Sequence, residues 1–422
     1  MLKYLPELIR DNVIDHETAD RITSYYLQKR SEAPSKFLII FGILGALLIG
    51  MGVILILAHN WDDFPKWLRT FIAFLPLVLS QTASLYTLYG KSDVRLWREV
   101  SATFLFLSVG ITIALISQIY HISGELDKFL LTWMIIAAPI IYLLKSSFAT
   151  LLYIAGITYY ASTVSYWFYV SKEPYYYWLM LLFSFPYYYQ ALKNNQRNFI
   201  RFYNFLTSIS LLVVFGTFAY SLQNFTILLY SLTFGLMMLS DYIPLFKNYR
   251  SEDKTLYSLG YLGNFIMLFI LSFDWYWHEL YTHTFKFNLL TFHHPIILFF
   301  MLFLTIYLVY RKWKDSSDFQ LIDLSSLIIF ILVLIGIIKP SFSQVLMNLF
   351  ILIISLYGII VGVKSMSIAT LNRGLGIFTI LVLCRFFDRD IPFVVRGVVF
   401  VVIGLGFFYA NHRIMRKIKN EK

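Results

Sequence analysis

FLIIFGILGALLIGMGVILIL is the sequence of residues 37–57, and none of its side chains is charged. A transmembrane helix needs about 20 consecutive apolar residues, so this stretch predicts a membrane span. The run ends abruptly at residues 58–65, AHNWDDFP. The predicted span therefore places a dense polar cluster at one face of the membrane.

Composition supports a membrane protein. Of the 422 residues, 59% are hydrophobic and only 14% are charged, and the mean hydropathy is +0.68. A soluble domain of this length cannot bury so much apolar surface. The single cysteine, Cys384, excludes an internal disulfide.

Apolar runs of span length recur along the whole chain. They are too long for barrel strands, so they predict an all-α polytopic integral membrane protein with about 14 transmembrane helices. The gap between the fourth and fifth runs is very short, which indicates either a tight turn or one re-entrant member. The predicted spans are 37–58, 67–89, 99–120, 129–145, 147–165, 174–192, 199–221, 224–242, 255–273, 294–310, 321–338, 342–363, 370–387 and 392–412.

The distribution of Lys and Arg predicts the orientation. With the N-terminus inside, 26 of the 35 basic residues fall on the cytoplasmic side and nine on the other. This bias follows the positive-inside rule and predicts that both termini are cytoplasmic. It also accounts for the whole net charge of +11, because the acidic residues balance the basic ones outside. A nucleic-acid partner is therefore not needed to explain the charge.

Residues 1–36 predict a cytoplasmic amphipathic helical hairpin. Its first helix has Leu2, Leu5 and Ile9 on one side, and its second helix begins at Asp15, a favoured N-cap residue. A signal peptide would place its apolar core within this stretch, which here is highly charged. The alternative interpretation is a docking site for a cytoplasmic partner at residues 1–36.

Four polar clusters fall on the predicted outer face. They follow the first span, the third span, the ninth span and the thirteenth span, and the last one includes an arginine within an apolar run. Ionisable groups at span ends and within spans are costly unless paired, which makes them candidates for substrate binding. A structural ion pair or a plain interfacial loop would explain the same residues. The candidates are His59, Asn60, Trp61, Asp62, Asp63, Gln118, Tyr120, His121, Glu125, Arg385, Asp388, Asp390 and Arg396.

The third cluster is the loop from Asp274 to Pro295, which contains four histidines. His293 and His294 are adjacent and cannot share a helix face, and His278 and His283 lack helical spacing. We therefore predict no metal site. Within the spans, Asn204, Asn264 and Asn348 are expected to join helices by hydrogen bonds.

Four short motifs resemble a family of bacterial predicted membrane proteins called domain of unknown function 2157. They are LPEL at residues 5–8 with the hairpin after it, GILGALLIGMG at 42–52, AHNWDD at 58–63 and QIYHI at 118–122. The resemblance covers about residues 5–145 and implies a multi-pass protein of the bacterial cytoplasmic membrane. It implies no activity and no catalytic residue. We accordingly divide the chain into 1–36, a family-resembling region 37–145, and a remaining membrane region 146–422 with a basic tail.

Three functions remain open from the sequence. The first is a transporter or flippase-like carrier of an amphipathic or lipid-linked substrate. The second is a membrane-embedded glycosyl or acyl transferase whose site lies on the extracytoplasmic face. The third is a scaffold of a membrane complex. Beyond the lipid bilayer and a possible lipid-linked substrate, the sequence names no partner, and the cofactor is unknown.

Overall fold

The computed structural model describes residues 9–11, 13–32, 48, 61–166, 174–218, 223–243, 254–277, 293–315 and 319–388, with isolated positions between 394 and 412. It divides into two compact units, Met1–Leu75 and Pro76–Lys422. Helix α4, Lys66–Gly90, contains the boundary and carries Pro76 in its interior. Proline removes a helical hydrogen bond and commonly bends a helix where it occurs.

The first unit contains helix α2, His16–Glu32. Its N-terminus is capped as predicted, because the Thr18 amide donates to Asp15 Oδ1 over 3.3 Å. Ala19, in the first turn of this helix, is buried. Of the predicted first helix, Leu2 and Leu5 lie outside the described residues, so the hairpin remains a prediction.

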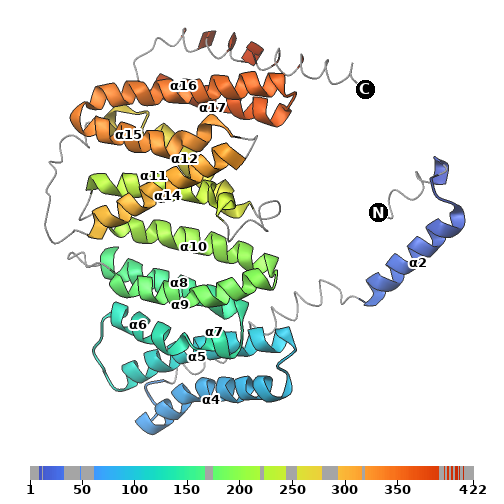
Figure 1. Cartoon of the computed structure of the whole chain (residues 1–422). Coiled ribbons are helices and arrows are strands. Elements are labelled where there is room, and N and C mark those ends of the chain that lie inside the picture. The colour runs from blue at the N-terminus through green and yellow to red at the C-terminus, as the bar shows by residue number, and fades with distance from the viewer. Residues whose placement is uncertain are drawn as a thin grey trace. The chain divides into compact units, whose positions relative to one another are not determined.

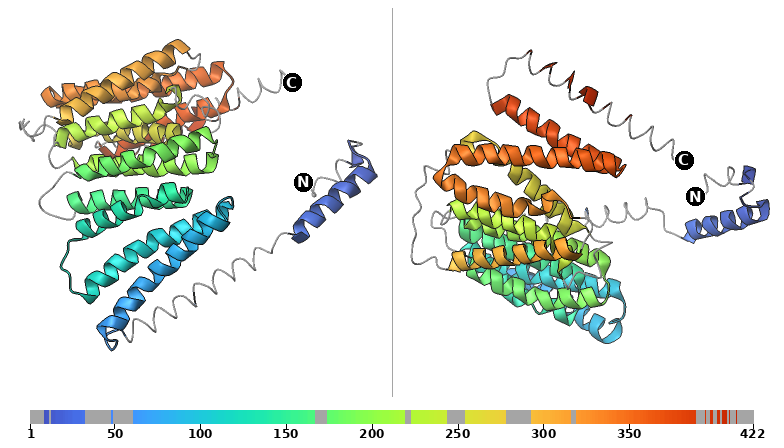
Figure 2. Two further views of the ribbon diagram at one scale, coloured as in Figure 1. Left: turned by 60° about the horizontal axis from the view of Figure 1, so that its bottom comes forward. Right: turned by 45° about the horizontal axis from the view of Figure 1, so that its top comes forward.

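The described part of the second unit is helical, and Figures 1 and 2 show its helices side by side. Every predicted span from 67–89 to 370–387 coincides with a helix or helix pair, because each apolar run is long enough to form one. The elements after α4 are α5 (Arg95–Ile119), α6 (Leu126–Ala137), α7 (Ile140–Leu143), α8 (Ser147–Tyr166), α9 (Tyr175–Lys193), α10 (Arg197–Thr217), α11 (Gln223–Met238), η2 (Ser240–Tyr242), α12 (Thr255–Ile270), α14 (His293–Asp315), η5 (Leu321–Leu324), α15 (Ser325–Ile338), α16 (Pro340–Lys364) and α17 (Ile368–Asp388).

Eight helices within the described ranges are long and apolar enough to cross a membrane. Helices α8 and α9 are of similar length but are not among the eight, because α8 is rich in tyrosine, serine and threonine and α9 is rich in tyrosine. The predicted spans 37–58 and 392–412 lie almost entirely outside the described residues. A total of fourteen spans and the inward orientation of both termini therefore remain predictions.

The short gap between the fourth and fifth predicted spans is a tight turn. Helix α7 ends at Leu143, Lys145 adopts a left-handed backbone with φ 49°, and α8 begins at Ser147. Glu99 of α5 closes the turn, because its carboxylate accepts the amides of Ser147 (3.1 Å) and Phe148 (2.9 Å). A carboxylate at a helix N-terminus satisfies otherwise unpaired amides and complements the helix dipole.

The buried side chains of the second unit form two main cores. One joins α5 to α10 and includes Tyr153, Tyr177 and Tyr203. The other runs from the end of α10 to α17 and includes Trp277 and Ile351. The two cores differ in composition, since tyrosine is frequent in the first and branched aliphatic side chains dominate the second.

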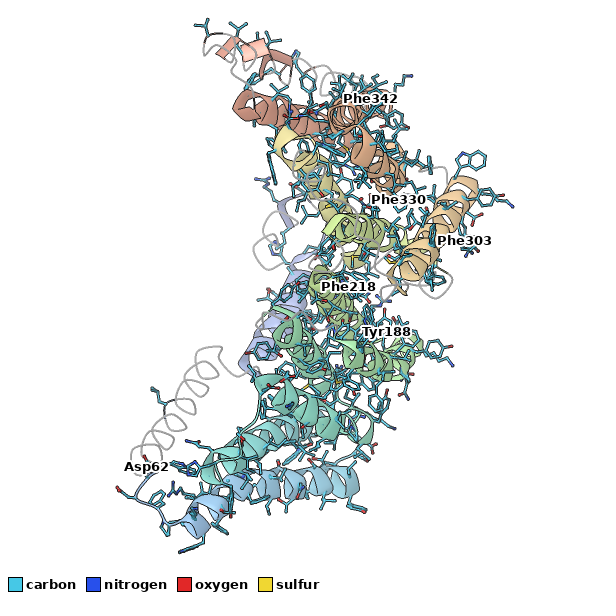
Figure 3. All side chains as sticks on the ribbon, turned by 90° about the vertical axis from the view of Figure 1, so that its left-hand side faces the viewer. Asp62, Tyr188, Phe218, Phe303, Phe330 and Phe342 are labelled. Atoms are coloured by element: carbon cyan, nitrogen blue, oxygen red, sulfur yellow. The ribbon has the colours of Figure 1, made fainter. Side chains whose placement is uncertain are left out.

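Glycines allow the backbones of α16 and α17 to approach closely. A Cβ on Gly374 of α17 would lie 2.6–2.8 Å from the backbone of Ser355, Gly358 and Ile359 on α16. Only a residue without a side chain permits this approach, as in other membrane helix pairs joined by small residues. The exterior of the unit is apolar as well. Phe303 and Phe342 are exposed, whereas Phe218 and Phe330 are buried (Figure 3).

Candidate functional site

The described part of the first predicted cluster, residues 61–63, lies in the turn before α4, in the first unit. Trp61 is half-buried, while Asp62 and Asp63 are exposed. The Asp62 carboxylate lies 3.8 Å from Arg69 Nη1, and its side chain is 99% exposed. An ion pair this open to solvent contributes little to stability and leaves the carboxylate unconstrained.

The second cluster belongs to the second unit, where α5 ends. Gln118, Tyr120, His121 and Glu125 are all exposed. His121 has a left-handed backbone with φ 49°, which turns the chain out of the helix. Glu125 pairs with Lys128 over 3.1 Å, three residues further along. The cluster is a surface turn with local pairing, and a convergence of the first two clusters remains a prediction.

Part of the predicted site lies outside the described residues, namely His59, Asn60, Asp390 and Arg396. Asp388 ends α17, and its side chain is also outside the description. Among the described residues, no group of three or more His, Cys, Asp or Glu side chains could hold a metal ion.

Arg385 joins the fourth predicted cluster to the third. Its Nη2 donates to Ser272 Oγ over 3.1 Å, and its guanidinium lies 5.2 Å from the centre of the Phe273 ring. Ser272 and Phe273 directly precede residues 274–277, which are helical in the structure although the sequence predicted a loop from Asp274. The sequence flagged both segments separately, and the fold brings them together at the end of α12.

Two amides of α16 complete this polar cluster. Asn348 Nδ2 donates to the Ser272 carbonyl over 3.0 Å. With its amide oriented to satisfy both partners, Gln344 donates to Asp274 Oδ1 (3.0 Å) and accepts from the Asp274 amide (3.1 Å). These bonds fasten the chain after α12 to α16 and α17. The expectation that Asn348 joins helices is confirmed.

Asn264 of α12 differs from the other two span asparagines. It is 0% exposed, and neither side-chain atom has a hydrogen-bond partner among the described residues. A buried amide without partners costs about 1–3 kcal/mol. The expectation that Asn264 joins helices by hydrogen bonds is therefore wrong for the described part of the protein, although its burial was foreseen.

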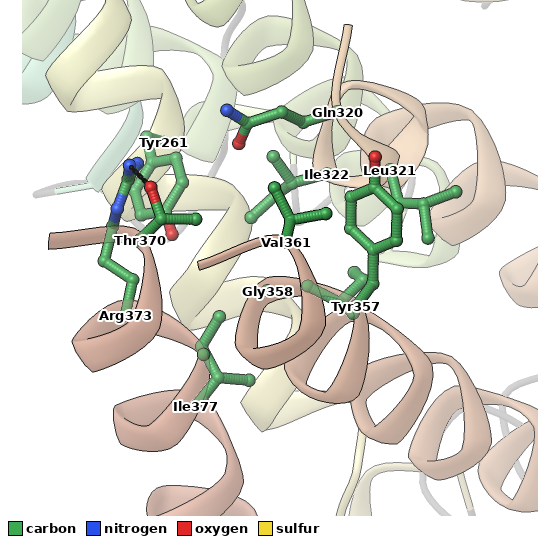
Figure 4. A pocket seen from close by; sticks show the side chains of 12 residues that line it. Tyr261, Gln320, Leu321, Ile322, Tyr357, Gly358, Val361, Thr370, Arg373 and Ile377 are labelled. Atoms are coloured by element: carbon green, nitrogen blue, oxygen red, sulfur yellow. Dashed lines mark hydrogen bonds between the residues drawn. The ribbon is translucent and has the colours of Figure 1, made fainter. Parts of the chain in front are cut away.

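A small, mainly apolar cavity lies between α12, α16, α17 and the residues around η5 (Figure 4). Arg373 Nη2 donates to Thr370 Oγ1 over 3.4 Å on one wall, next to Tyr261, and Gln320 lies on another. The volume is about 40 Å³. This space is sufficient for a water molecule or two but not for an organic substrate.

A much larger cavity, of about 380 Å³, lies between α9, α10, α11 and α12. Its lining is mostly apolar and aromatic, with a few hydroxyl and amide groups, and includes no charged side chain. Volume and composition are those of a typical small-molecule site between membrane helices. The lining residues are Trp178, Leu181, Leu182, Phe185, Tyr188, Tyr203, Asn204, Thr207, Ser208, Leu211, Met237 and Leu256.

The polar part of this lining is tied together by hydrogen bonds and ring stacking. The Tyr188 hydroxyl donates to Asn204 Oδ1 over 2.6 Å, and the Ser208 hydroxyl donates to the Asn204 carbonyl over 2.7 Å. The rings of Tyr188 and Tyr203 stack with centroids 4.2 Å apart and planes 16° from parallel. The result is a stiff aromatic wall that carries hydroxyl groups. The expectation that Asn204 bridges helices is confirmed.

The cavity lies where the two cores meet. Trp178 packs against both cores, whereas Tyr188 and Tyr203 belong to the first core and Leu211 packs against the second. Leu182 is 67% exposed on the outside of α9. The cavity is therefore open at the molecular surface on this side of α9.

The sequence did not single out this cavity. Asn204 was noted, but the neighbouring tyrosines and hydroxyl residues resemble ordinary packing residues in a chain with 31 Tyr. The available signal was the helical spacing of Asn204, Ser208 and Leu211 on one face of α10, combined with tyrosines on α9.

These features define a multi-helix membrane protein with an apolar cavity that opens at its surface. Residues 6–150 match the model of a family described as "Predicted membrane protein (DUF2157)", which confirms the resemblance predicted from the motifs. No curated protein and no solved structure matches the chain. The cavity of α9–α12 lies beyond the part of the chain that the family model covers.

Proposed function

We propose that the protein is a carrier of an amphipathic or lipid-linked substrate in the bacterial cytoplasmic membrane. The observation that supports this function is the cavity of about 380 Å³ at the junction of the two cores. Substrate sites of carriers commonly lie near the bilayer midplane between two helix bundles. A cavity at such a junction can open to either side when the bundles move relative to each other.

An outward-facing transferase is the less favoured alternative. Its proposed acids include Asp62 and Glu125, which are exposed and paired with Arg69 and Lys128, respectively. Catalytic acids and bases are usually found in clefts, where burial and neighbouring charges shift their pKa values. A scaffold role would need no cavity, so an occupied cavity argues for the carrier over the scaffold.

Occupancy of the cavity can be tested by photo-crosslinking in vesicles of phosphatidylethanolamine and phosphatidylglycerol. The probe is an alkyl phosphate with a diazirine in its chain. We expect crosslinks on α9 and α10, and their loss in Leu211→Trp, which fills the cavity. Leu179→Trp is the matched control, because Leu179 is 65% exposed on α9 and does not line the cavity.

Movement across the bilayer is tested separately with an alkyl phosphate that carries a fluorescent NBD group on its chain. Dithionite destroys only the dye in the outer leaflet, so a carrier exposes the inner-leaflet dye as well. We expect the fluorescence of the inner-leaflet dye to be lost faster with the wild type and with Leu179→Trp than with Leu211→Trp. Equal rates in vesicles with and without the protein would contradict the carrier function.

A further inference from the structure

The cavity-lining face of α10 continues into two arginines. Asn204, Ser208 and Leu211 line the cavity, and Arg197 and Arg201 precede them at the same helical spacing. Steps of four, three, four and three residues keep all five side chains on one face of the helix. Both arginines are exposed, so the apolar cavity and the two cations form one continuous stripe.

The distances along this stripe suit a head group and a chain. With a rise of about 1.5 Å per residue, Arg201 lies about 4.5 Å and Arg197 about 10.5 Å along the helix axis from Asn204. Lys193, at the end of α9, holds its ammonium 4.9 Å from the centre of the Tyr189 ring. Three cations thus gather where the α9–α10 hairpin turns, at the same end of the cavity as the Tyr188–Tyr203 stack.

The cavity itself cannot accept an ionised group cheaply. Its lining includes no charged side chain, and moving an unpaired charge into such surroundings is strongly unfavourable. An anionic head group would instead remain at the hairpin, where guanidinium groups can bind a phosphate through paired hydrogen bonds. The apolar chain would then extend along α10 into the cavity.

From this arrangement we propose that the substrate is a lipid phosphate with a single apolar chain, such as a prenyl phosphate. The phosphate binds Arg197 and Arg201, and the chain occupies the cavity. The inference rests on the proposed carrier function and specifies its substrate class. The positive-inside rule accounts for basic residues at this end, but not for their position on the cavity-lining face.

The size of the cavity favours one chain over two. A cavity of about 150 Å³ is enough to bind benzene, so about 380 Å³ accommodates roughly the volume of two such rings and some additional carbons. One prenyl chain fits this space and can continue into the bilayer past Leu182. Both chains of a diacyl phospholipid do not fit into it together.

The proposal is tested by native mass spectrometry of the full chain released from detergent micelles. The probes are farnesyl phosphate, farnesol, inorganic phosphate and a dioleoyl phosphatidylglycerol. We expect one farnesyl phosphate per chain, bound at least tenfold more tightly than farnesol or the phospholipid, and no competition by inorganic phosphate. The charge variant is Arg197→Gln/Arg201→Gln, and its control is Lys91→Gln/Lys254→Gln, which removes two exposed cations elsewhere.

The cavity variant is Thr207→Phe, which fills the cavity, and its control is Ile209→Phe, which changes a residue outside the cavity lining on the same helix. We expect the charge variant to weaken the binding of farnesyl phosphate at least tenfold and to leave the binding of farnesol unchanged. The cavity variant should weaken the binding of both probes. The two control variants should bind like the wild type.

The outcomes separate this inference from the proposed function. If Thr207→Phe weakens both prenyl probes but the charge variant weakens neither, the head-group assignment is wrong and the carrier cavity stands. If the charge variant alone weakens binding, the phosphate binds the surface and the chain assignment is wrong. If no variant changes binding, both proposals fail.

Discussion

The buried ion pair between α14 and η5 gives the sharpest test of the fold. Lys312 Nζ lies 2.7 Å from Asp323 Oδ1, and the two side chains are only 8% and 1% exposed. The second carboxylate oxygen accepts the Gln320 amide over 2.8 Å. The ammonium also lies 5.6 Å from the centre of the Tyr242 ring. Asp323→Ala therefore removes the carboxylate that faces this buried ammonium and leaves the charge desolvated.

The expected cost of Asp323→Ala follows from this burial. Removing one partner of a buried pair typically destabilises a protein by about 3–5 kcal/mol, because the other charge remains desolvated. At about 1.4 kcal/mol per factor of ten, the unfolding equilibrium should shift by more than a hundredfold. Lys312→Met should cost less, because Asp323 keeps its bond from the Gln320 amide.

The double variant Lys312→Met/Asp323→Leu removes both charges and keeps apolar volume. Replacing a buried pair in this way is often neutral or stabilising, so we expect a stability within about 1 kcal/mol of the wild type.

The assay is reversible unfolding of the purified protein in mixed micelles by increasing sodium dodecyl sulfate, followed by tryptophan fluorescence. The wild type, Lys312→Met, Asp323→Leu and Lys312→Met/Asp323→Leu form a double-mutant cycle that isolates the coupling energy. A coupling below about 1 kcal/mol, the magnitude of an exposed pair, would refute the burial of these two residues.

Three further predictions follow from contacts elsewhere in the chain. Gly336→Ala should destabilise the protein by about 1–3 kcal/mol in the same assay, which is the usual cost of overpacking. A Cβ at this position would lie 2.0 Å from the buried ring of Trp277, so an unchanged unfolding midpoint would contradict this packing. Glu99→Ala should destabilise the protein by about 2 kcal/mol, since it removes the acceptor of the first amides of α8. These amides should then exchange their hydrogens faster with solvent, and exchange protection equal to that of the wild type would refute the capping role. Asp15 caps α2, and its hydrogen bond from Thr18 lowers the pKa of its carboxyl group below the ordinary 3.8. The stabilisation of α2 by this cap is therefore complete when the pH is above the ordinary pKa. It disappears as the pH falls through the lower pKa of the folded state. The Thr18 amide shift in an NMR pH titration should follow this change, and Asp15→Asn should abolish it.

The helices were largely predictable from the sequence because the membrane imposes one strong rule. Each backbone polar group must be satisfied within the segment, so an apolar run of sufficient length forms a helix. Even the tight turn before α8 was foreseen as one of two options. The role of Glu99 could not be predicted from the sequence, because it lies more than 40 residues away from the turn. Its carboxylate caps α8 and stabilises the turn.

The candidate site was less predictable, for a physical reason. Sequence reasoning weighs charged and histidine residues heavily because their burial is costly. This weighting flagged Arg385 and Asp274, whose segments the fold does join, but also exposed residues such as Glu125. The cavity arises from what neighbouring helices fail to fill, and Tyr188, Tyr203 and Leu211 are individually ordinary. Only their packing reveals the space between them.

The division of the second unit into two cores bears directly on the carrier proposal. Interiors packed as densely as organic crystals do not deform continuously, so a site opens when whole packed bodies move. The described helices pack into two buried clusters within one compact unit, and Trp178 contacts both clusters at the wall of the cavity. Asn204 and Leu211 lie on one helix, α10, yet they line the sides that belong to different cores. A movement of the second core relative to the first would therefore change the size of the cavity. The two arginines would keep their positions on the cavity-lining face of α10. The proposed carrier of a single-chain lipid phosphate requires this coupling, in which a fixed cationic end adjoins an apolar space of variable size.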